Sequence, residues 1–115
     1  MLERSLANSG CSGYNLARMH FAIVLAPEAI EDLRGLPASN RAKVKKAVEA
    51  HLRHEPTKVS RSRIKRLRGI SRPQYRLRVD EIRVFYDVWE RTVYVLAIVV
   101  KAEASLWLAK FGAPE

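Results

Sequence analysis

The sequence is short of the features that define several protein classes. It contains one cysteine, Cys11, in 115 residues, and a lone cysteine excludes the internal disulfide framework of small secreted domains. No stretch reaches the roughly 18 apolar residues that a membrane span requires. The N-terminus lacks the apolar core of a secretion signal. We therefore expect a cytoplasmic protein that has no membrane partner and folds around an ordinary hydrophobic core.

Motifs for cofactors and metals are also missing. The sequence has no glycine-rich phosphate loop, no pair of cysteines two residues apart and no His-Glu-x-x-His metal motif. His51 and His54 lie three residues apart, a spacing that can bind a metal on a helix. No carboxylate or thiol cluster accompanies them, so a surface or half-buried role is the simpler interpretation. We expect neither a metal nor a cofactor.

Acidic residues are scarce in one part of the chain. The sequence has 21 Lys and Arg against 12 Asp and Glu, a formal charge of +9. Residues 41–83 hold fifteen of these cations and four acids, a local balance of +11, whereas the remainder sums to −2. Such a concentration favours an anionic partner, namely nucleic acid, an acidic protein or an anionic surface. A basic surface kept only for solubility does not explain why the charge is concentrated.

The centre of the fold is expected between residues 73 and 101. Tyr75, Leu77 and Val79 alternate with Arg76 and Arg78, the period of two that a strand with one buried face shows. Asp80-Glu81 and Glu90-Arg91 predict tight turns. Residues 82–89 are rich in β-branched and aromatic residues. Residues 92–100 are nearly all apolar, which predicts a central strand covered on both faces. The sequence therefore predicts an antiparallel three-stranded meander.

The flanking segments predict a helical cover for this sheet. The order is βααβββα, an α+β fold in which a helical hairpin lies on one face of an antiparallel sheet. Pro27 suits the first turn of the first helix, and Ser39 or Asn40 is the expected N-cap of the second. The expected segments are a strand at 20–26, helices at 27–36, 38–55 and 102–111, and a basic connector at 57–72.

Residues 1–18 are rich in Ser, Asn and Gly and lack periodicity, so we interpret them as a flexible leader or an upstream extension. Met19 directly precedes the first predicted strand, so residues 19–115 form the predicted domain. Deleting residues 1–18 should leave stability almost unchanged. Thermal unfolding checks this expectation, and a fall in Tm well beyond a few degrees would contradict it.

The cations of the meander predict an anion site. Strand geometry places Arg76 and Arg78 on one face about 7 Å apart. Two guanidinium groups at that distance repel each other unless an anion bridges them, and their planar forks suit phosphate. The functional interpretation is a phosphate-binding sheet face. The structural alternative is that Asp87, Glu103 or an acidic partner covers that face.

Six segments between residues 19 and 111 carry a family resemblance. They are APEA at 26–29, DLRGLP at 32–37, KRLRG at 65–69, YRLRV at 75–79, IRVFYDV at 82–88 and VKAEA at 100–104. Together they resemble the RelE/ParE superfamily of bacterial type II toxins, which implies a compact microbial RNase-like fold and an acidic antitoxin that binds and neutralises the toxin as a hetero-oligomer. RelE-like members cleave mRNA in the ribosomal A site without a metal, and ParE-like members inhibit DNA gyrase.

The resemblance also implies site residues. The family's catalytic cations match Arg68, Arg76, Arg78 and Arg83, with Lys101 as the nearest cation at the last helix. A further arginine and a tyrosine of the ribonucleases align with Ala102 and Leu108, so both groups are missing here. Tyr75 and Tyr86 are the nearest phenols. The expected RNA-binding residues are Arg41, Lys45, Lys46, Arg53, Lys65 and Arg66.

Arginine changes the chemistry that these positions can perform. An arginine stabilises negative charge but is never deprotonated in a protein, so Arg76 and Arg78 cannot act as the base. Lys65 or Lys101 would take the proton, or the ribosome would position the 2′-hydroxyl so well that little base is needed. Three functions therefore stay open: an mRNA endoribonuclease, a gyrase inhibitor, and a weakened toxin-like RNA-binding protein.

Overall fold

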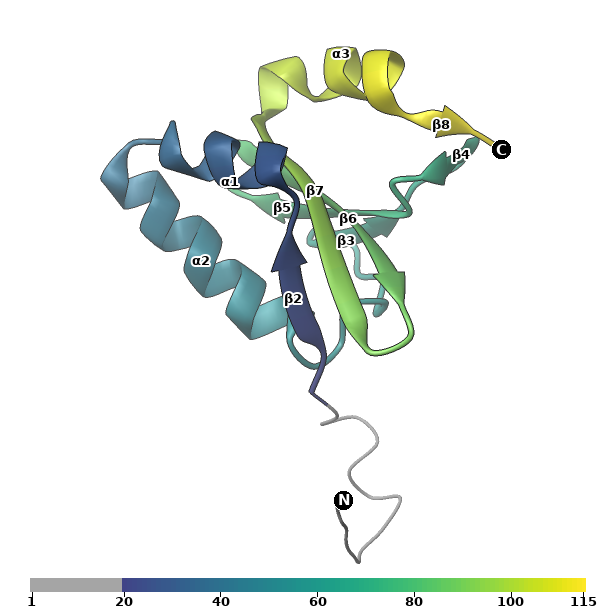
Figure 1. Cartoon of the computed structure of the whole chain (residues 1–115), viewed down its shortest axis with the longest axis horizontal. Coiled ribbons are helices and arrows are strands. Elements are labelled where there is room, and N and C mark those ends of the chain that lie inside the picture. Colours follow the sequence, from purple (N-terminus) through teal and green to yellow (C-terminus); the bar gives the residue numbers. More distant parts are fainter. Residues whose placement is uncertain (1–19) are drawn as a thin grey trace, which may run out of the picture.

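The computed structural model describes residues 20–115, and the predicted leader lies outside them. Within the described residues, helices and strands follow the predicted α+β order, with additions between the second helix and the meander and at the C-terminus (Figure 1). Their bounds are β2 Ala22–Leu25, α1 Pro27–Arg34, α2 Ala38–Leu52, β3 Ile64–Arg66, β4 Ile70–Arg72, β5 Tyr75–Val79, β6 Ile82–Trp89, β7 Thr92–Val100, α3 Lys101–Phe111 and β8 Ala113–Pro114.

The predicted meander is confirmed, but the sheet is mixed rather than wholly antiparallel. Its strand order is β2-β7-β6-β5-β3. Strands β5, β6 and β7 pair antiparallel through two-residue turns at Asp80-Glu81 and Glu90-Arg91. Strand β2 pairs parallel with β7. Strands β2 and β7 are far apart in the sequence, because the helical hairpin and four strands lie between them. A tight turn would force them to be antiparallel, but a long connection allows them to run parallel.

The predicted basic connector contains two short strands. Strand β3 pairs antiparallel with β5, with Ile64 opposite Leu77, and is the fifth strand of the sheet. Strand β4 pairs with β8 in a separate two-stranded sheet. Gly69 lies between β3 and β4 with φ of 74°, a conformation that favours glycine. Three residues with a single apolar side chain are too few to show alternation, so the sequence did not reveal β3.

Helices α1 and α2 cover one face of the sheet. The core beneath them includes Val44 and Leu52 from α2 and alternate residues of the strands. Helix α1 is also tied to the sheet by Asp32, whose Oδ2 accepts the backbone N–H of Ile98 at 3.0 Å, close to the irregular β6–β7 pairing. Helix α2 follows Pro37 without a side-chain cap, so the expected Ser39 or Asn40 cap is wrong.

Helix α3 lies on the opposite face of the sheet, at the upper end of Figure 1. It is anchored by Trp107, which stacks on Phe85 of β6 with ring centroids 5.1 Å apart. Tyr94 and Val100 of β7 remain 37% and 40% exposed, so the expectation that this strand is covered on both faces holds only for its middle. Within residues 20–115, no helix has both the length and the apolar character needed to cross a membrane.

Candidate nucleic-acid interface

Four predicted site residues share the sheet face opposite α1 and α2. Strand register sets Lys65 beside Arg76, and Arg76 beside Phe85, across β3, β5 and β6. In the next row Arg78 lies opposite Arg83. Neighbouring strands are about 4.8 Å apart, so these side chains form one compact group. We call Lys65, Arg76, Arg78 and Arg83 the cationic face.

The cationic face has no acidic partner within the described part of the chain. None of the ion pairs found between residues 20 and 115 includes its members. Asp87, a possible cover, instead pairs with Arg72 at 3.0 Å and accepts the backbone N–H of Gln74 at 2.7 Å. Four neighbouring positive charges without a carboxylate repel one another, and a bound anion would relieve that repulsion.

Arg76 is the most constrained member of the cationic face. It is half-buried, and its Nε is buried without a hydrogen-bond partner among residues 20–115. Burial lowers the pKa of Arg76, and the charges of Arg83 and Arg78 lower it further. The guanidinium is thus poorly solvated and retains an unused donor. A phosphate that supplies both charge and an acceptor would gain most at this residue.

Arg83 lies deeper than the resemblance implies. It is 6% exposed, and its Nη1 donates to the backbone oxygens of Asp80 at 2.8 Å and Ile82 at 3.0 Å. These bonds fix the guanidinium beside the first meander turn. Arg83 therefore acts on a ligand mainly through its charge and by holding Arg76 and Arg78 in a positive field.

The remaining predicted catalytic cations lie at opposite ends of this face. Arg68 precedes Gly69 in the turn that follows β3, near the Gln74 end of β5. Lys101 begins α3 directly after Val100, which pairs with Ile82 at the other end. The structure thus gathers Arg76, Arg78 and Arg83 and sets Arg68 and Lys101 on either side of them.

The two phenols nearest in sequence lie on the wrong face. Tyr75 and Tyr86 stack on each other with ring centroids 5.5 Å apart, on the side of α1 and α2. The hydroxyl of Tyr86 donates to the backbone oxygen of Pro56 at 2.7 Å, and burial raises its pKa. Neither ring reaches the cationic face. Lys65 and Lys101 are therefore the candidates for proton transfer there.

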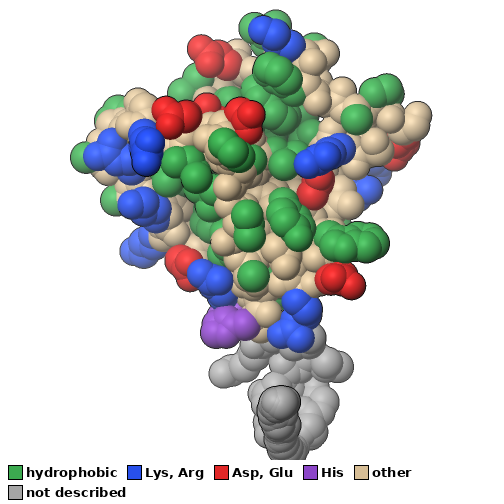
Figure 2. Space-filling model, viewed as in Figure 1, with side chains coloured by type: hydrophobic (Ala, Val, Ile, Leu, Met, Phe, Trp, Pro, Cys, Tyr) green, Lys and Arg blue, Asp and Glu red, His purple; other side chains and the backbone are tan. Residues whose placement is uncertain are grey.

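Three of the predicted RNA-binding arginines make hydrogen bonds or ion pairs within the protein. Arg41 donates to the backbone oxygen of Leu36 at 2.7 Å, which joins α1 to α2. Arg53 pairs with Glu49 and donates to the backbone oxygen of Phe21 at 3.0 Å. Arg66 donates to the backbone oxygen of Gln74 at 2.8 Å. Lys45 and Lys46 are exposed on α2, where Figure 2 shows basic side chains gathered.

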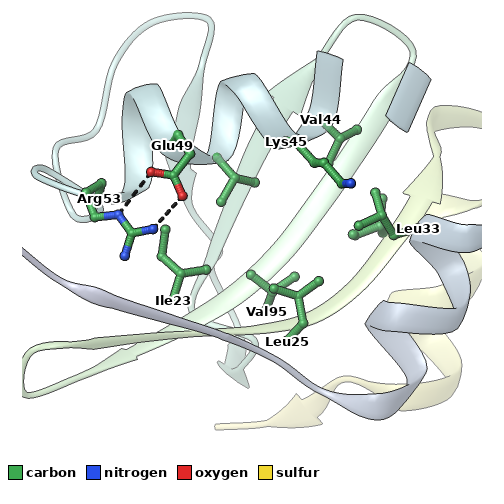
Figure 3. Close-up of a pocket in the computed structure, with 10 residues that line it drawn as sticks. Ile23, Leu25, Leu33, Val44, Lys45, Glu49, Arg53 and Val95 are labelled. Atoms are coloured by element: carbon green, nitrogen blue, oxygen red, sulfur yellow. Dashed lines mark hydrogen bonds and ion pairs between the residues drawn. The ribbon is translucent and has the colours of Figure 1, made fainter. Parts of the chain in front are cut away.

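A groove of about 420 Å³ lies between α2 and the strands β2 and β7. We call it the apolar groove. Lys45 lies at its rim, and the paired Glu49 and Arg53 close one end (Figure 3). Figure 2 shows hydrophobic side chains in this hollow, next to the basic ones of α2. The apolar lining residues are Ile23, Leu25, Leu33, Val44, Val48, Val95 and Ile98.

Sequence reasoning missed Arg63. Its backbone oxygen accepts the N–H of Arg78 at 2.8 Å, so it extends the row of Arg83 and Arg78 onto a third strand position. The signal that could have found it is the alternation of Arg63 and Lys65 around the buried Ile64. Phe85 was not expected beside Arg76 either, because only the strand register brings it there.

Comparisons with known proteins place this chain among toxins. The family model described as "ParE toxin of type II toxin-antitoxin system, parDE" matches residues 23–104. RelE1 of Methanocaldococcus jannaschii is 32% identical over 88 residues, which cover 76% of this chain and 96% of that protein.

Two solved structures are similar over most of their length. The RelE toxin of E. coli, determined in the free state with two arginines replaced by alanine, is 26% identical with a TM-score of 0.57, covering 79% of this chain and 93% of that one. RelE in the RelE–RelB complex of Pyrococcus horikoshii OT3 is 20% identical with a TM-score of 0.60, covering 72% and 97%. The latter similarity concerns the fold alone.

Proposed function

Because this chain belongs to the RelE/ParE superfamily and is a toxin of the type II toxin–antitoxin kind, we propose that it cleaves messenger RNA in the ribosomal A site. The observation that carries this proposal is the cationic face, which holds four cations without an acidic partner among residues 20–115. A cluster of this kind suits a phosphodiester, whose charge increases as the pentavalent phosphorane forms.

In this proposal the cations stabilise the negative charge in two ways, by direct binding and by longer-range attraction. Arg76 has a buried donor without a partner among the described residues, and Arg78 is exposed on the same face, so both can bind the scissile phosphate directly. Arg83 contributes positive charge from below while the backbone oxygens of Asp80 and Ile82 hold it in place. The energy gained is largest in the transition state, because the phosphate carries most negative charge there.

A lysine completes the chemistry in this proposal. The 2′-hydroxyl must lose a proton to attack the phosphorus, and the leaving 5′-oxygen must gain one. Lys65 lies in register beside Arg76, and Lys101 lies at the Arg83 end of the face. A lysine accepts the proton only through its neutral amine. The ribosome would supply the alignment of the 2′-hydroxyl.

The pH dependence of cleavage should therefore follow a lysine. The single-turnover rate should rise as pH increases through the lysine pKa, because only the neutral amine accepts the proton, and no rise should centre near 6.5. His51→Ala and His54→Ala should retain the wild-type rate on ribosome-bound mRNA. A rate limb near 6.5 that disappears in either histidine variant would place the base outside the cationic face.

A gyrase inhibitor is the second candidate. It is favoured by the match to the ParE family model and by the position of Tyr75 and Tyr86 on the opposite face of the sheet. An inhibitor that acts by binding needs no proton transfer, so the missing phenol would not matter. Supercoiling assays with the purified chain separate the two candidates.

An acidic antitoxin is the expected partner. RelE toxins similar in fold are found in complexes with RelB. Here the apolar groove offers hydrophobic contacts beside Lys45, and α2 and the cationic face provide positive charge. We expect an antitoxin segment with apolar anchors and acidic side chains to cover the groove, the cationic face, or both.

Binding of that antitoxin should depend strongly on salt. The association rate should fall as salt rises, because long-range attraction to the basic surface speeds encounter, while the dissociation rate should change less. Stopped-flow mixing of the purified partners measures both rates. An association rate that ignores salt, or a pull-down from the native host that recovers no cognate partner, would contradict this expectation.

A further inference from the structure

Besides the apolar groove, a second hollow lies beyond the outer edge of strand β3, and its lining is largely basic. It has a volume of about 300 Å³ and is formed between the end of α2 and the segment that leads into β3. We call it the edge pocket. Its polar walls come from His51, His54, Glu55, Lys58, Ser60 and Arg63. Neither the family resemblance nor the proposed mechanism uses these residues.

Arg63 connects the edge pocket, on the α2 side of β3, with the cationic face on the other side of the sheet. Arg83 lies opposite Arg78 across β6 and β5, and the N–H of Arg78 donates to the backbone oxygen of Arg63 at 2.8 Å. These three arginines therefore form a row across neighbouring strands. The row spans two strand spacings, about 10 Å, and ends where Arg63 lines the pocket. An extended nucleotide chain held at Arg76 and Arg78 reaches the pocket within a nucleotide or two.

The pocket presents donors to a ligand. Ser60 Oγ accepts the backbone N–H groups of Arg63 at 3.0 Å and Ile64 at 3.2 Å, so its own O–H proton remains available. The same bonds fix the backbone of Arg63. Lys58 meets Glu55 at 3.8 Å, but both side chains are largely exposed, and such a pair holds little energy. Lys58, Arg63 and Ser60 thus offer donors that need an acceptor.

The charges near His51 support the same conclusion. Burial lowers the pKa of His51, and the positive charge of Arg63 lowers it further. Arg63 therefore acts on the interior of the pocket as well as on the outer surface. Among residues 20–115, Glu55 is the one acid that lines the pocket, and it already meets Lys58. A ligand that offers only acceptor oxygens and negative charge matches this lining.

We propose that the edge pocket binds a backbone phosphate of the RNA next to the scissile one. The proposal rests on the proposed function, since it assumes that the cationic face holds RNA. Lys58, Arg63 and Ser60 are then substrate-binding residues, and the RNA runs across the strands from β6 towards β3. A pocket for an acidic protein segment is the competing outcome, and the test distinguishes the two.

The test measures RNA affinity in a charge-matched pair of variants. The first, Lys58→Ala with Arg63→Ala, removes two cations from the pocket. The second, Arg34→Ala with Lys110→Ala, removes two exposed cations from α1 and α3 that do not line the pocket. Both lower the formal charge from +9 by two. Their melting temperatures should match the wild type, because all four side chains are exposed.

The probe is a fluorescent single-stranded RNA whose 2′-hydroxyls are methylated so that it cannot be cleaved. We expect the pocket variant to bind at least ten-fold more weakly than the control variant. Its plot of log affinity against log salt should be shallower by about 0.7, the change expected when one phosphate contact to a single strand is lost. Shortening the RNA by the phosphate that fills the pocket should abolish this difference. Equal affinity of the two variants would overturn the proposal.

Two further readouts separate this proposal from its rivals. In the wild type, RNA should raise the pKa of His51 seen by NMR, because an adjacent phosphate favours the imidazolium, and the pocket variant should lose this change. A glutamate-rich peptide of equal charge that displaces the RNA as well as RNA itself does would assign the pocket to a protein and overturn the proposal. If the pocket variant loses RNA affinity but the wild type does not cleave mRNA on the ribosome, the proposed function is refuted and the RNA-binding pocket stands.

Discussion

Replacing Arg76 with alanine should lower the single-turnover rate of mRNA cleavage on the ribosome by about 10² to 10³, the usual effect of removing one donor to a developing negative charge. Arg76 is half-buried, and its Nε has no hydrogen-bond partner among residues 20–115. Burial lowers its pKa, and the charges of Arg83 and Arg78 lower it further. Arg76→Lys should restore only part of the rate, because an ammonium group cannot make the bidentate contact. Rates are measured with saturating toxin on stalled ribosomes that carry a defined A-site codon.

The control for this prediction is Arg34→Ala. Arg34 is exposed on α1 and pairs only with Glu31 among its described neighbours. Its replacement therefore removes the same charge as Arg76→Ala, but outside the cationic face. It should retain cleavage within about two-fold, the effect of lost long-range attraction alone. If Arg76→Ala and Arg34→Ala have equal rates, Arg76 does not contact the scissile phosphate.

Replacing Phe85 with alanine should destabilise the protein by about 3–5 kcal/mol, the usual cost of removing a buried phenyl ring. Phe85 is fully buried and stacks on Trp107, so the change opens a cavity between the sheet and α3. Most domains of this size have a total stability of about 5–15 kcal/mol. The loss should therefore appear as a large shift of the urea midpoint.

Phe111→Ala is the matched control for that change. Phe111 lies on the same helix, tilted against Trp107, but it is 60% exposed. Its removal should cost less than about 1.5 kcal/mol, because little apolar surface leaves the protein interior. Equal midpoints for the two variants would mean that α3 does not pack on the sheet through Phe85.

The sequence predicts the part of the fold in which local pattern is strong. Alternation at Tyr75, Arg76 and Leu77 marks β5, and the two charged turns mark the meander. The parallel pairing of β2 with β7 depends on a contact between the two ends of the domain, which no local pattern encodes. Strand β3 has three residues, too few for a periodicity to stand out from the surrounding basic segment.

The site is predictable to the same extent. Strand alternation correctly places Arg76 and Arg78 on one face, since a period of two follows from backbone geometry alone. The burial of Arg83 depends on the turn carbonyls of Asp80 and Ile82, and the commitment of Arg41 and Arg53 depends on carbonyls of other elements. A basic residue in a sequence does not show whether its charge faces solvent or caps a backbone oxygen.

The most direct test of the account is to map cleaved mRNA ends in cells that express the wild type or Arg76→Ala, with plasmid supercoiling measured in the same cultures. We expect mRNA ends within A-site codons in the wild type, at least a hundred-fold fewer such ends in the variant at equal protein level, and unchanged supercoiling in both. Intact mRNA together with reduced supercoiling in the wild type would contradict it and establish the protein as a gyrase inhibitor.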